Sequence, residues 1–250
     1  MTALLGFCAC GRATGPGRVT AAASRRAPGT PEPSLGLAGD TEWVLTAEAM
    51  KINQNTVLRG KRATLVPYMS AHVPRYHEWM QSEELQRLTA SEPLSLEQEY
   101  EMQCSWRDDT DKCTFIVLDT ERWPGQADED CMVGDVNLFL TDPEDPTLAE
   151  IEIMIAEPSY RGRGFGKEAT LMMMSYGVRN LGITTFEAKI GQENEASICM
   201  FKKLHFKEVA VNSVFQEVTL RLDVSDQERR WLLEQTNHVE ERSYVEQAAS

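Results

Sequence analysis

The sequence predicts a mixed α/β (α+β) domain, and three neighbouring patterns carry that prediction. Residues 148–157 read LAEIEIMIAE, with apolar and polar residues in the alternation that is typical of a strand. A glycine-rich loop, RGRGFG at 161–166, follows at once, and residues 167–182 then have the periodicity of a helix. A chain of 250 residues that is 42% hydrophobic can also bury a sizeable core.

The remaining elements follow from the same periodicities and from capping residues. Ser95 and Gln98 have the spacing of a capping box, Gly182 ends the helix after the loop, and Ser225 caps a helix at 226–235. Pro74 is tolerated only in a first turn, so the helical segment 70–88 is expected to be interrupted. Strands are expected at 63–68, 113–120, 131–140, 148–157, 184–190, 207–212 and 215–224, and further helices at 95–106 and 194–204.

The two ends of the chain differ from this pattern. Residues 1–50 are rich in Gly, Ala, Pro and Ser and lack a hydrophobic period, so we expect a disordered extension. Four arginines precede its first acidic residue, Glu32, as in a mitochondrial transit peptide, but glycines and a proline at 11–17 interrupt any amphipathic helix. The sequence therefore favours an extension that is not a targeting signal, in a cytoplasmic protein, over a mitochondrial one. Residues 224–250 are expected to form a short helix and a polar tail.

Composition excludes several classes of partner. The net charge of −14 and the pI near 4.8 disfavour nucleic acid and anionic lipid, and they suit a cationic protein substrate. No apolar run approaches the roughly 20 residues of a membrane span. The six cysteines are scattered without zinc-ligand spacing, so we expect reduced thiols and no metal.

The glycine loop predicts a phosphate site. Glycines allow positive φ and a close approach of ligand to backbone, and exposed amides at the start of a helix attract anions. A tight turn without a ligand needs only one glycine, whereas this loop has three with cations beside them: Gly162, Gly164 and Gly166, with Arg161, Arg163 and Lys167.

Two familiar phosphate motifs do not fit. A Walker loop needs Ser or Thr after its lysine and a glycine five residues before the last one, but Glu168 follows Lys167 and Arg161 occupies the glycine position. A dinucleotide loop needs its third glycine one residue later than Gly166, and it normally follows the first strand of its domain.

The loop resembles the pyrophosphate loop of the GCN5-related N-acetyltransferase (GNAT) superfamily, Arg/Gln-x-x-Gly-x-Gly/Ala. A second motif of that family, Asn-x-x-Ser/Ala-Ile-(x)4-Lys-Leu-Gly-Phe, is similar to NEASICMFKKLHF at 194–206. The resemblance covers roughly residues 56 to 223. Within the superfamily the chain resembles the ribosomal-protein alanine acetyltransferase branch, and most closely the N-acetyltransferase 9-like group, by LTASEPLSLEQEYEMQCSW at 88–106 and CMVGDVNLFLTD at 131–142.

This resemblance implies a fold and a cofactor. The expected domain spans 51–223 and has a mostly antiparallel mixed sheet with a splayed parallel pair, 148–157 beside 184–190, and helices on both faces. Acetyl-CoA is expected between those two strands, with its pyrophosphate on the loop amides and its pantetheine along the first strand. The implied cofactor contacts are Met154, Ile155, Ala156, Arg161, Gly162, Arg163, Gly164, Phe165, Gly166, Lys167, Asn194, Ser197 and Phe201.

Candidate catalytic residues lie on the polar face of residues 148–157. Glu150 and Glu152 share that face, opposite the isoleucines, and Glu152 is the first candidate for the base, with Glu150 second. A solvated strand face or an amine anchor is the alternative role. Asp135 and Asn137, on the preceding strand, are candidates for substrate binding.

Two positions depart from the family pattern. Phe201 stands where many members have a tyrosine that protonates the departing thiolate, and it cannot donate a proton. His205 replaces the glycine before the closing phenylalanine; we expect a surface turn residue there, at a cost of about 1 kcal/mol if φ is positive.

The resemblance therefore implies a protein N-acetyltransferase that uses acetyl-CoA, acting on an N-terminal amine or a lysine, with tubulin as one candidate acceptor. Two alternatives stay open from the residues. One is an acetyl-CoA-binding regulatory protein with little catalysis, for which Phe201 speaks. The other is an acetyltransferase of small amines.

Overall fold

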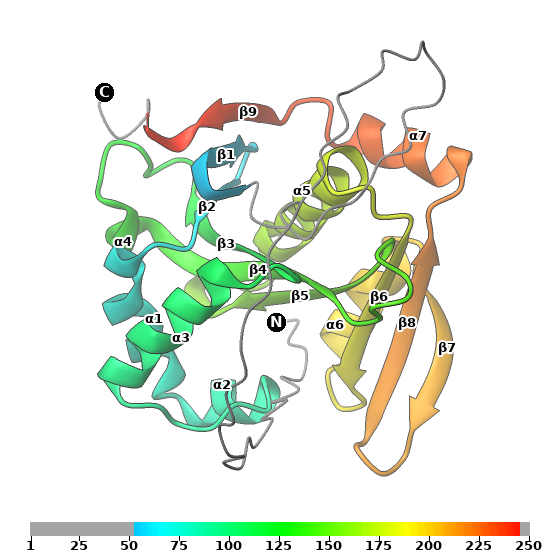
Figure 1. Cartoon of the computed structure of the whole chain (residues 1–250), viewed down its shortest axis with the longest axis horizontal. Coiled ribbons are helices and arrows are strands. Elements are labelled where there is room, and N and C mark those ends of the chain that lie inside the picture. The colour runs from blue at the N-terminus through cyan, green and yellow to red at the C-terminus, as the bar shows by residue number, and fades with distance from the viewer. Residues whose placement is uncertain (1–52, 246–250) are drawn as a thin grey trace, which may run out of the picture. The chain divides into compact units, whose positions relative to one another are not determined.

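The computed structural model of this protein describes residues 53–245, which form a mixed sheet with helices on both faces (Figure 1). The extension expected at 1–50 lies outside the described residues. The strands are β1 (Thr56–Arg59), β2 (Ala63–Pro67), β3 (Lys112–Asp119), β4 (Met132–Leu140), β5 (Leu148–Ile155), β6 (Thr185–Gly191), β7 (Lys207–Asn212), β8 (Glu217–Asp223) and β9 (Glu240–Ser243). Their order across the sheet is β7-β8-β6-β5-β4-β3-β2-β1-β9.

The helices divide between the two faces according to the alternation in β5. They are η2 (Ser70–His72), α1 (Val73–Met80), α2 (Glu83–Leu88), α3 (Leu96–Asp108), α4 (Asp128–Cys131), η3 (Pro158–Tyr160), α5 (Phe165–Asn180), α6 (Glu195–Lys203) and α7 (Asp226–Gln235). The isoleucines of β5 pack in one core with residues of α5, α6 and α7, whereas Met154 packs in a second core with residues of α1 and α2. Within residues 53–245, no helix is long and apolar enough to cross a membrane.

The parallel pair separates as the resemblance predicts. Strands β5 and β6 are paired only from Leu148–Thr185 to Glu150–Glu187, and the other neighbouring strands of the described sheet are antiparallel. Beyond Glu150, β5 remains paired with β4 while β6 remains paired with β8. Figure 1 shows β6, β8 and β7 turning away from β5, so that one edge of β5 has no neighbouring strand in the described part of the sheet beyond Glu150.

The helix ends that the sequence predicts from capping residues are present in the structure. The Ser95–Gln98 capping box is present, Ser225 caps α7, and Gly182 follows α5 with φ +70°. The helical segment at 70–88 is interrupted as expected, and Pro74 lies in the first turn of α1. The side chains of Ser95 and Ser225 accept hydrogen bonds from backbone amides that the helices leave without an acceptor.

The chain's C-terminal segment corrects one prediction. Part of the expected polar tail is strand β9. All four of its residues pair with β1, so β9 is an edge strand of the sheet, and the sequence did not predict it. Tyr244 continues this attachment because its hydroxyl donates to Asp128 Oδ2 at 2.8 Å. Asp128 is the first residue of the short helix α4, so α4 is joined to the C-terminal segment. The pairing joins β9, which is polar, to a strand far away in the sequence, and hydrophobic periodicity does not detect such a contact.

Candidate active site at the separated strands

The glycine loop begins helix α5 with two left-handed residues. Gly162 has φ +73° and Gly164, the N-cap of α5, has φ +91°. A residue with a side chain is strained in this region of φ, so these two glycines are required by the backbone. The first amides of a sixteen-residue helix are thereby presented at the end of β5. Such amides can bind an anion.

The cations of the loop do not act as one group in this structure. Arg161 turns back to the protein: its Nε donates to the carbonyl of Ile155 at 3.0 Å, and Nη1 lies 3.1 Å from Glu84 Oε1. Arg163 is exposed and lies over the ring of Tyr160, 5.0 Å from its centre, and Lys167 is also exposed. Arg163 and Lys167 are therefore placed to meet a phosphate from solution, while Arg161 supports the end of β5.

Glu168 holds the start of α5 against the turn between β1 and β2. Its carboxylate accepts the backbone amides of Lys61, Arg62 and Ala63 at 3.0, 2.7 and 2.9 Å, and His238 Nε2 lies 3.2 Å away. Burial raises the pKa of Glu168, but these donors outweigh burial and leave the pKa below its ordinary value. The residue that excluded a Walker loop is thus a structural support of the anion site.

Beyond Glu150 no strand of the described sheet pairs with the open edge of β5, and we call this break in the sheet, beside the start of α5 and α6, the gap. A Cβ built on Gly166 would lie 3.5 Å from Ile155 and 3.9 Å from Ile153 of β5 and 3.8 Å from Met200 of α6, so Gly166 lies between these elements. Asn194 caps α6 with its Oδ1, while its Nδ2 is buried and lacks a hydrogen-bond partner among residues 53–245. An unsatisfied buried donor is costly, and a ligand acceptor in the gap would satisfy it.

Two other expected cofactor contacts of α6 lie differently. Ser197 donates its hydroxyl to Asn194 Oδ1 at 2.7 Å, so it orients Asn194. Phe201 is fully buried and packs edge-to-face on Phe206, with ring centres 5.0 Å apart. Phe201 belongs to the core in this structure, and its contact with the cofactor stays a prediction.

The backbone of Met154 is set by an unusually close strand contact. A Cβ on Gly134, in β4, would lie only 1.8 Å from the Met154 carbonyl oxygen, so only glycine fits there. The side chains of Met154, Ile155 and Ala156 are all buried. Any ligand contact from these three residues would have to come from their backbone, as the resemblance predicts.

Glu150 spans the point where the two strands separate. It belongs to the last paired position of β5 and β6, and Lys189, two residues further along β6, donates from Nζ to Glu150 Oε2 at 2.6 Å. Burial raises the pKa of Glu150, and Lys189 opposes that rise. Because this carboxylate already binds an ammonium, it is the weaker candidate for a base.

Glu152 is the second carboxylate on this face of β5. Its side chain is buried. Burial raises the pKa of Glu152 well above its ordinary value; Lys112 opposes this rise, whereas Glu150 and Asp135 add to it. A buried carboxyl with a raised pKa beside an open strand edge is suited to accept a proton.

Asp135 and Asn137 stand next to Glu152 in the sheet, with Asn137 directly opposite it. Asn137 accepts from Thr114 Oγ1 at 2.6 Å and donates to Asp135 Oδ2 at 2.7 Å, so both ends of its side chain are bonded within the protein. Asp135 Oδ1 is buried without a hydrogen-bond partner in the described part of the chain, and burial raises the pKa of Asp135 to about 6. Asn137 therefore supports the site, and Asp135 keeps one oxygen for a further contact.

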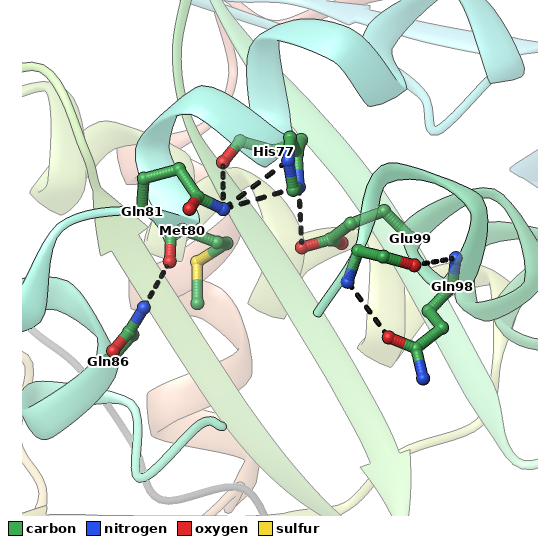
Figure 2. Close-up of polar contacts among 7 residues, drawn as sticks. His77, Met80, Gln81, Gln86, Gln98 and Glu99 are labelled. Atoms are coloured by element: carbon green, nitrogen blue, oxygen red, sulfur yellow. Dashed lines mark hydrogen bonds and ion pairs between the residues drawn. The ribbon is translucent and has the colours of Figure 1, made fainter. Parts of the chain in front are cut away.

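Helices α1 and α3 are tied to each other on this face of the sheet. Figure 2 shows His77 between Gln81 and Glu99, with its Nδ1 3.7 Å from Glu99 Oε1. Gln103 Nε2 donates to the carbonyl of Tyr68 at 2.8 Å and so attaches α3 to the chain just after β2. Burial raises the pKa of Glu99, and His77 opposes that rise. These contacts hold α1, α3 and the chain after β2 together on this face of the sheet.

His205 is confirmed as a residue of a surface turn. It has φ +71°, its Nδ1 lies 2.8 Å from Glu228 Oε2, and its ring lies 4.0 Å from that of Trp231. These contacts hold the strained turn to α7.

Sequence reasoning missed Lys112, Lys189 and Glu168. A lysine that opens the apolar run KCTFIVLD is a visible anomaly, and Glu187 and Lys189 alternate with apolar residues along β6. These signals mark unusual residues, but only the register of the sheet shows which carboxylates they meet. Residues 53–245 contain no cluster of three or more His, Cys, Asp or Glu that could hold a metal, and the four cysteines described are free thiols.

Comparisons with known proteins agree with this geometry. The family model for the acetyltransferase (GNAT) domain matches residues 62–207. A Mus musculus protein named alpha/beta-tubulin-N-acetyltransferase 9 is 72% identical over 198 residues, covering 78% of this chain and 82% of its own. The Homo sapiens protein of the same name is 71% identical over 204 residues, covering 80% of this chain and 99% of its own.

A solved structure shares the fold. Spermidine N-acetyltransferase from Vibrio cholerae, solved with CoA and spermine, has a TM-score of 0.56 at 18% identity, covering 66% of this chain and 97% of its own. At that identity the likeness concerns the fold alone. Taken with the domain match and the close relatives, the separated strands and the glycine loop show that the chain belongs to the GNAT family and is an acetyl-CoA-dependent N-acetyltransferase.

Proposed function

We propose that this enzyme acetylates an amine of a protein and that tubulin is the acceptor. The support is the identity of 72% and 71% to two relatives named for α/β-tubulin. A tubulin acceptor would have the enzyme act in the cytoplasm, the compartment that the sequence favours, and imaging of the intact chain in cells tests this.

The observation that carries the proposed chemistry is the burial of Glu152, which raises its pKa. An acceptor amine arrives as an ammonium ion and must lose a proton before its nitrogen can attack the thioester. The burial that raises the pKa of Glu152 makes it a stronger base than an exposed carboxylate, and a bound ammonium would lower that pKa again. Glu152 then accepts the proton, and the neutral amine forms the new amide bond.

The residues beside the gap are suited to hold acetyl-CoA, which supplies the acetyl group. The amides that begin α5 would bind its pyrophosphate, with Arg163 and Lys167 adding charge from the exposed side. Asn194 Nδ2 would donate to an acceptor on the cofactor, and the β5 backbone near Met154 would pair with the pantetheine and stabilise the developing oxyanion.

The leaving group does not require an acid from Phe201. A thiol has an ordinary pKa near 8.5, so the thiolate leaves more readily than an alkoxide or amide would. The burial of Phe201 is therefore compatible with catalysis, and it favours a mechanism in which protonation of the thiolate comes from water.

The test combines purified tubulin and acetyl-CoA with wild-type enzyme and Glu152→Gln. We expect wild type to release CoA thiol and to add one acetyl group to tubulin, which mass spectrometry detects. We expect the variant to be slower by about 100-fold or more. Peptide mapping then distinguishes an N-terminal amine from a lysine. Glu101→Gln, an exposed carboxylate on α3, is the matched control. Full turnover by Glu152→Gln would refute the role of the base, and thiol release with spermidine but not with tubulin would refute the acceptor.

A further inference from the structure

Lys112 is a buried cation on the same face of the sheet as the candidate base. It begins β3 and is only 4% exposed. Its Nζ lies 2.9 Å from the centre of the Trp106 ring and 4.1 Å from that of Phe139. Aromatic faces attract a desolvated cation, so the two rings fix the position of this ammonium.

The register of the sheet aligns Lys112 with the carboxylates. Lys112 pairs with Phe139, which pairs with Glu150, and in the next row on this face Thr114 pairs with Asn137, which pairs with Glu152. Side chains two residues apart on a strand point to the same face. Lys112 and Glu152 therefore lie on one face, on strands separated by β4 alone.

The charges around Glu152 come from several elements. Lys112 from β3 exerts the largest favourable charge effect on Glu152; Glu150 from β5 and Asp135 from β4 oppose it, and Lys189 from β6 adds a smaller favourable effect. Lys189 is already bonded to Glu150. Lys112 is thus the main cation that acts on the candidate base.

The groups around Lys112 itself are mostly acidic. Glu152, Asp135 and Asp109, the last at the end of α3, attract its ammonium. Three further ionisable groups face these residues: Tyr68, Tyr76 and Glu99. Burial raises the pKa values of Tyr68 and Tyr76, and the negative charges of Asp135 and Glu99 raise them further. Burial lowers the pKa of Lys112 to about 7, against the attraction of these carboxylates.

A pocket borders Lys112. It has a volume of about 120 Å³, room for a few waters, and its lining includes Asn53, Tyr68, Trp106, Lys112 and Thr114. Lys112 Nζ and the Tyr68 hydroxyl are both buried from solvent, so the pocket borders Lys112 without hydrating its ammonium. The charge of Lys112 therefore stays desolvated on the face that carries the carboxylates.

We propose that Lys112 is a positioning residue for acetyl transfer, whose buried charge keeps Glu152 in the carboxylate form that accepts the proton of the acceptor. The inference rests on the proposed function of Glu152. When Glu152 takes the proton of the ammonium, one N–H bond breaks, one O–H bond forms and no other bond changes.

The first experiment measures Glu152 directly, without substrate. The side-chain carboxyl of Glu152 is titrated by carbon NMR in the intact protein, with Glu152→Gln to assign its resonance. We expect Lys112→Met to raise the midpoint of Glu152 by about one pH unit or more, and Lys112→Arg to restore most of it. Lys207→Met, an exposed lysine on β7, is the control. An unchanged midpoint in Lys112→Met would overturn the inference, and Lys112→Gln repeats the test if the methionine variant does not fold.

Kinetics then separate this inference from the proposed function. The acid limb of the kcat/KM profile should move upward in Lys112→Met by the same amount as the NMR midpoint, about tenfold in rate per pH unit. The affinity for acetyl-CoA should stay within twofold of wild type, because Lys112 does not border the cofactor gap. A shifted midpoint with an unshifted acid limb would mean that Glu152 is not the base, which contradicts the proposed function while the coupling to Lys112 stands. A lower rate at every pH, with the same midpoint, would show a merely structural role and overturn the inference.

Discussion

Replacing Gly166 by alanine should stabilise the protein and weaken its affinity for acetyl-CoA. Gly166 is the second residue of α5 and has no positive φ, so its backbone conformation suits alanine. The new methyl would lie 3.5 Å from Ile155, 3.8 Å from Met200 and 3.9 Å from Ile153, all ordinary contact distances. The same methyl would lie between β5 and α6 at the start of α5, where the cofactor is expected.

The magnitudes follow from helix propensity and from the lost space. Alanine is favoured over glycine by about 0.5–1 kcal/mol within a helix, and by less near its start. For a domain of this size the melting temperature should rise by about 1–4 °C. If the methyl pushes the pyrophosphate away from the amides of α5, the affinity should fall by about tenfold or more, which corresponds to roughly 1.4 kcal/mol.

Calorimetric titration with acetyl-CoA and thermal unfolding measure both effects on the same sample. Gly125→Ala is the matched control, because its new methyl would lie 3.4 Å from the Arg122 carbonyl oxygen, in the segment between β3 and α4 and outside the glycine loop and α6. The control should leave the affinity unchanged. Unaltered cofactor affinity in Gly166→Ala would show that the ligand does not lie over the start of α5, and a lowered melting temperature would refute the packing argument.

Two further predictions concern the supports of the site. Glu168→Ala should lower the free energy of unfolding by about 2–4 kcal/mol at pH 7, since the buried amide of Ala63 loses its acceptor while the exposed amides regain water; Glu101→Gln is the control. The pKa of Glu168 is lowered in the folded state, so its contribution to the free energy of unfolding is present above the unfolded pKa and disappears as pH falls through the folded pKa. In denaturant titrations at several pH values, the unfolding free energies of wild type and Glu168→Ala should therefore become equal in acid. Asp128→Asn should lower the free energy of unfolding by about 1–3 kcal/mol at neutral pH. Burial raises the pKa of Asp128, but hydrogen bonds from His72, Tyr244 and Trp123 lower it by more, so the pKa is below its ordinary value. Its effect should likewise vanish in acid, and an equal loss at all pH values would show that charge is not involved.

The sequence predicted the parts of the site that depend on local backbone chemistry. Gly162 and Gly164 have positive φ as expected, and Ser95 and Ser225 cap the helices that their spacing indicated. The direction in which Glu150 and Glu152 point also followed from simple alternation. These features are determined within a few residues of chain, so a single sequence contains them.

The parts that were missed depend on contacts between distant segments. Arg161 had the charge of a phosphate ligand, but the carbonyl of Ile155 and the carboxylate of Glu84 hold it inside the protein. Strand β9 has no apolar pattern and exists because β1 offers an open edge. Lys112 reaches Glu152 only through the register of three strands. Composition and periodicity do not contain this information.

The most direct test of the account is to locate acetyl-CoA on the protein by hydrogen exchange. Saturating acetyl-CoA should slow exchange at amides of Ile151–Ile155 on β5 and of the loop and first turn at 162–168. Exchange in β1 and β9, at the other edge of the sheet, should not change. Slower exchange at the far edge, or unaltered exchange along β5 and the loop at saturation, would contradict the conclusion that the separated strands form the active site.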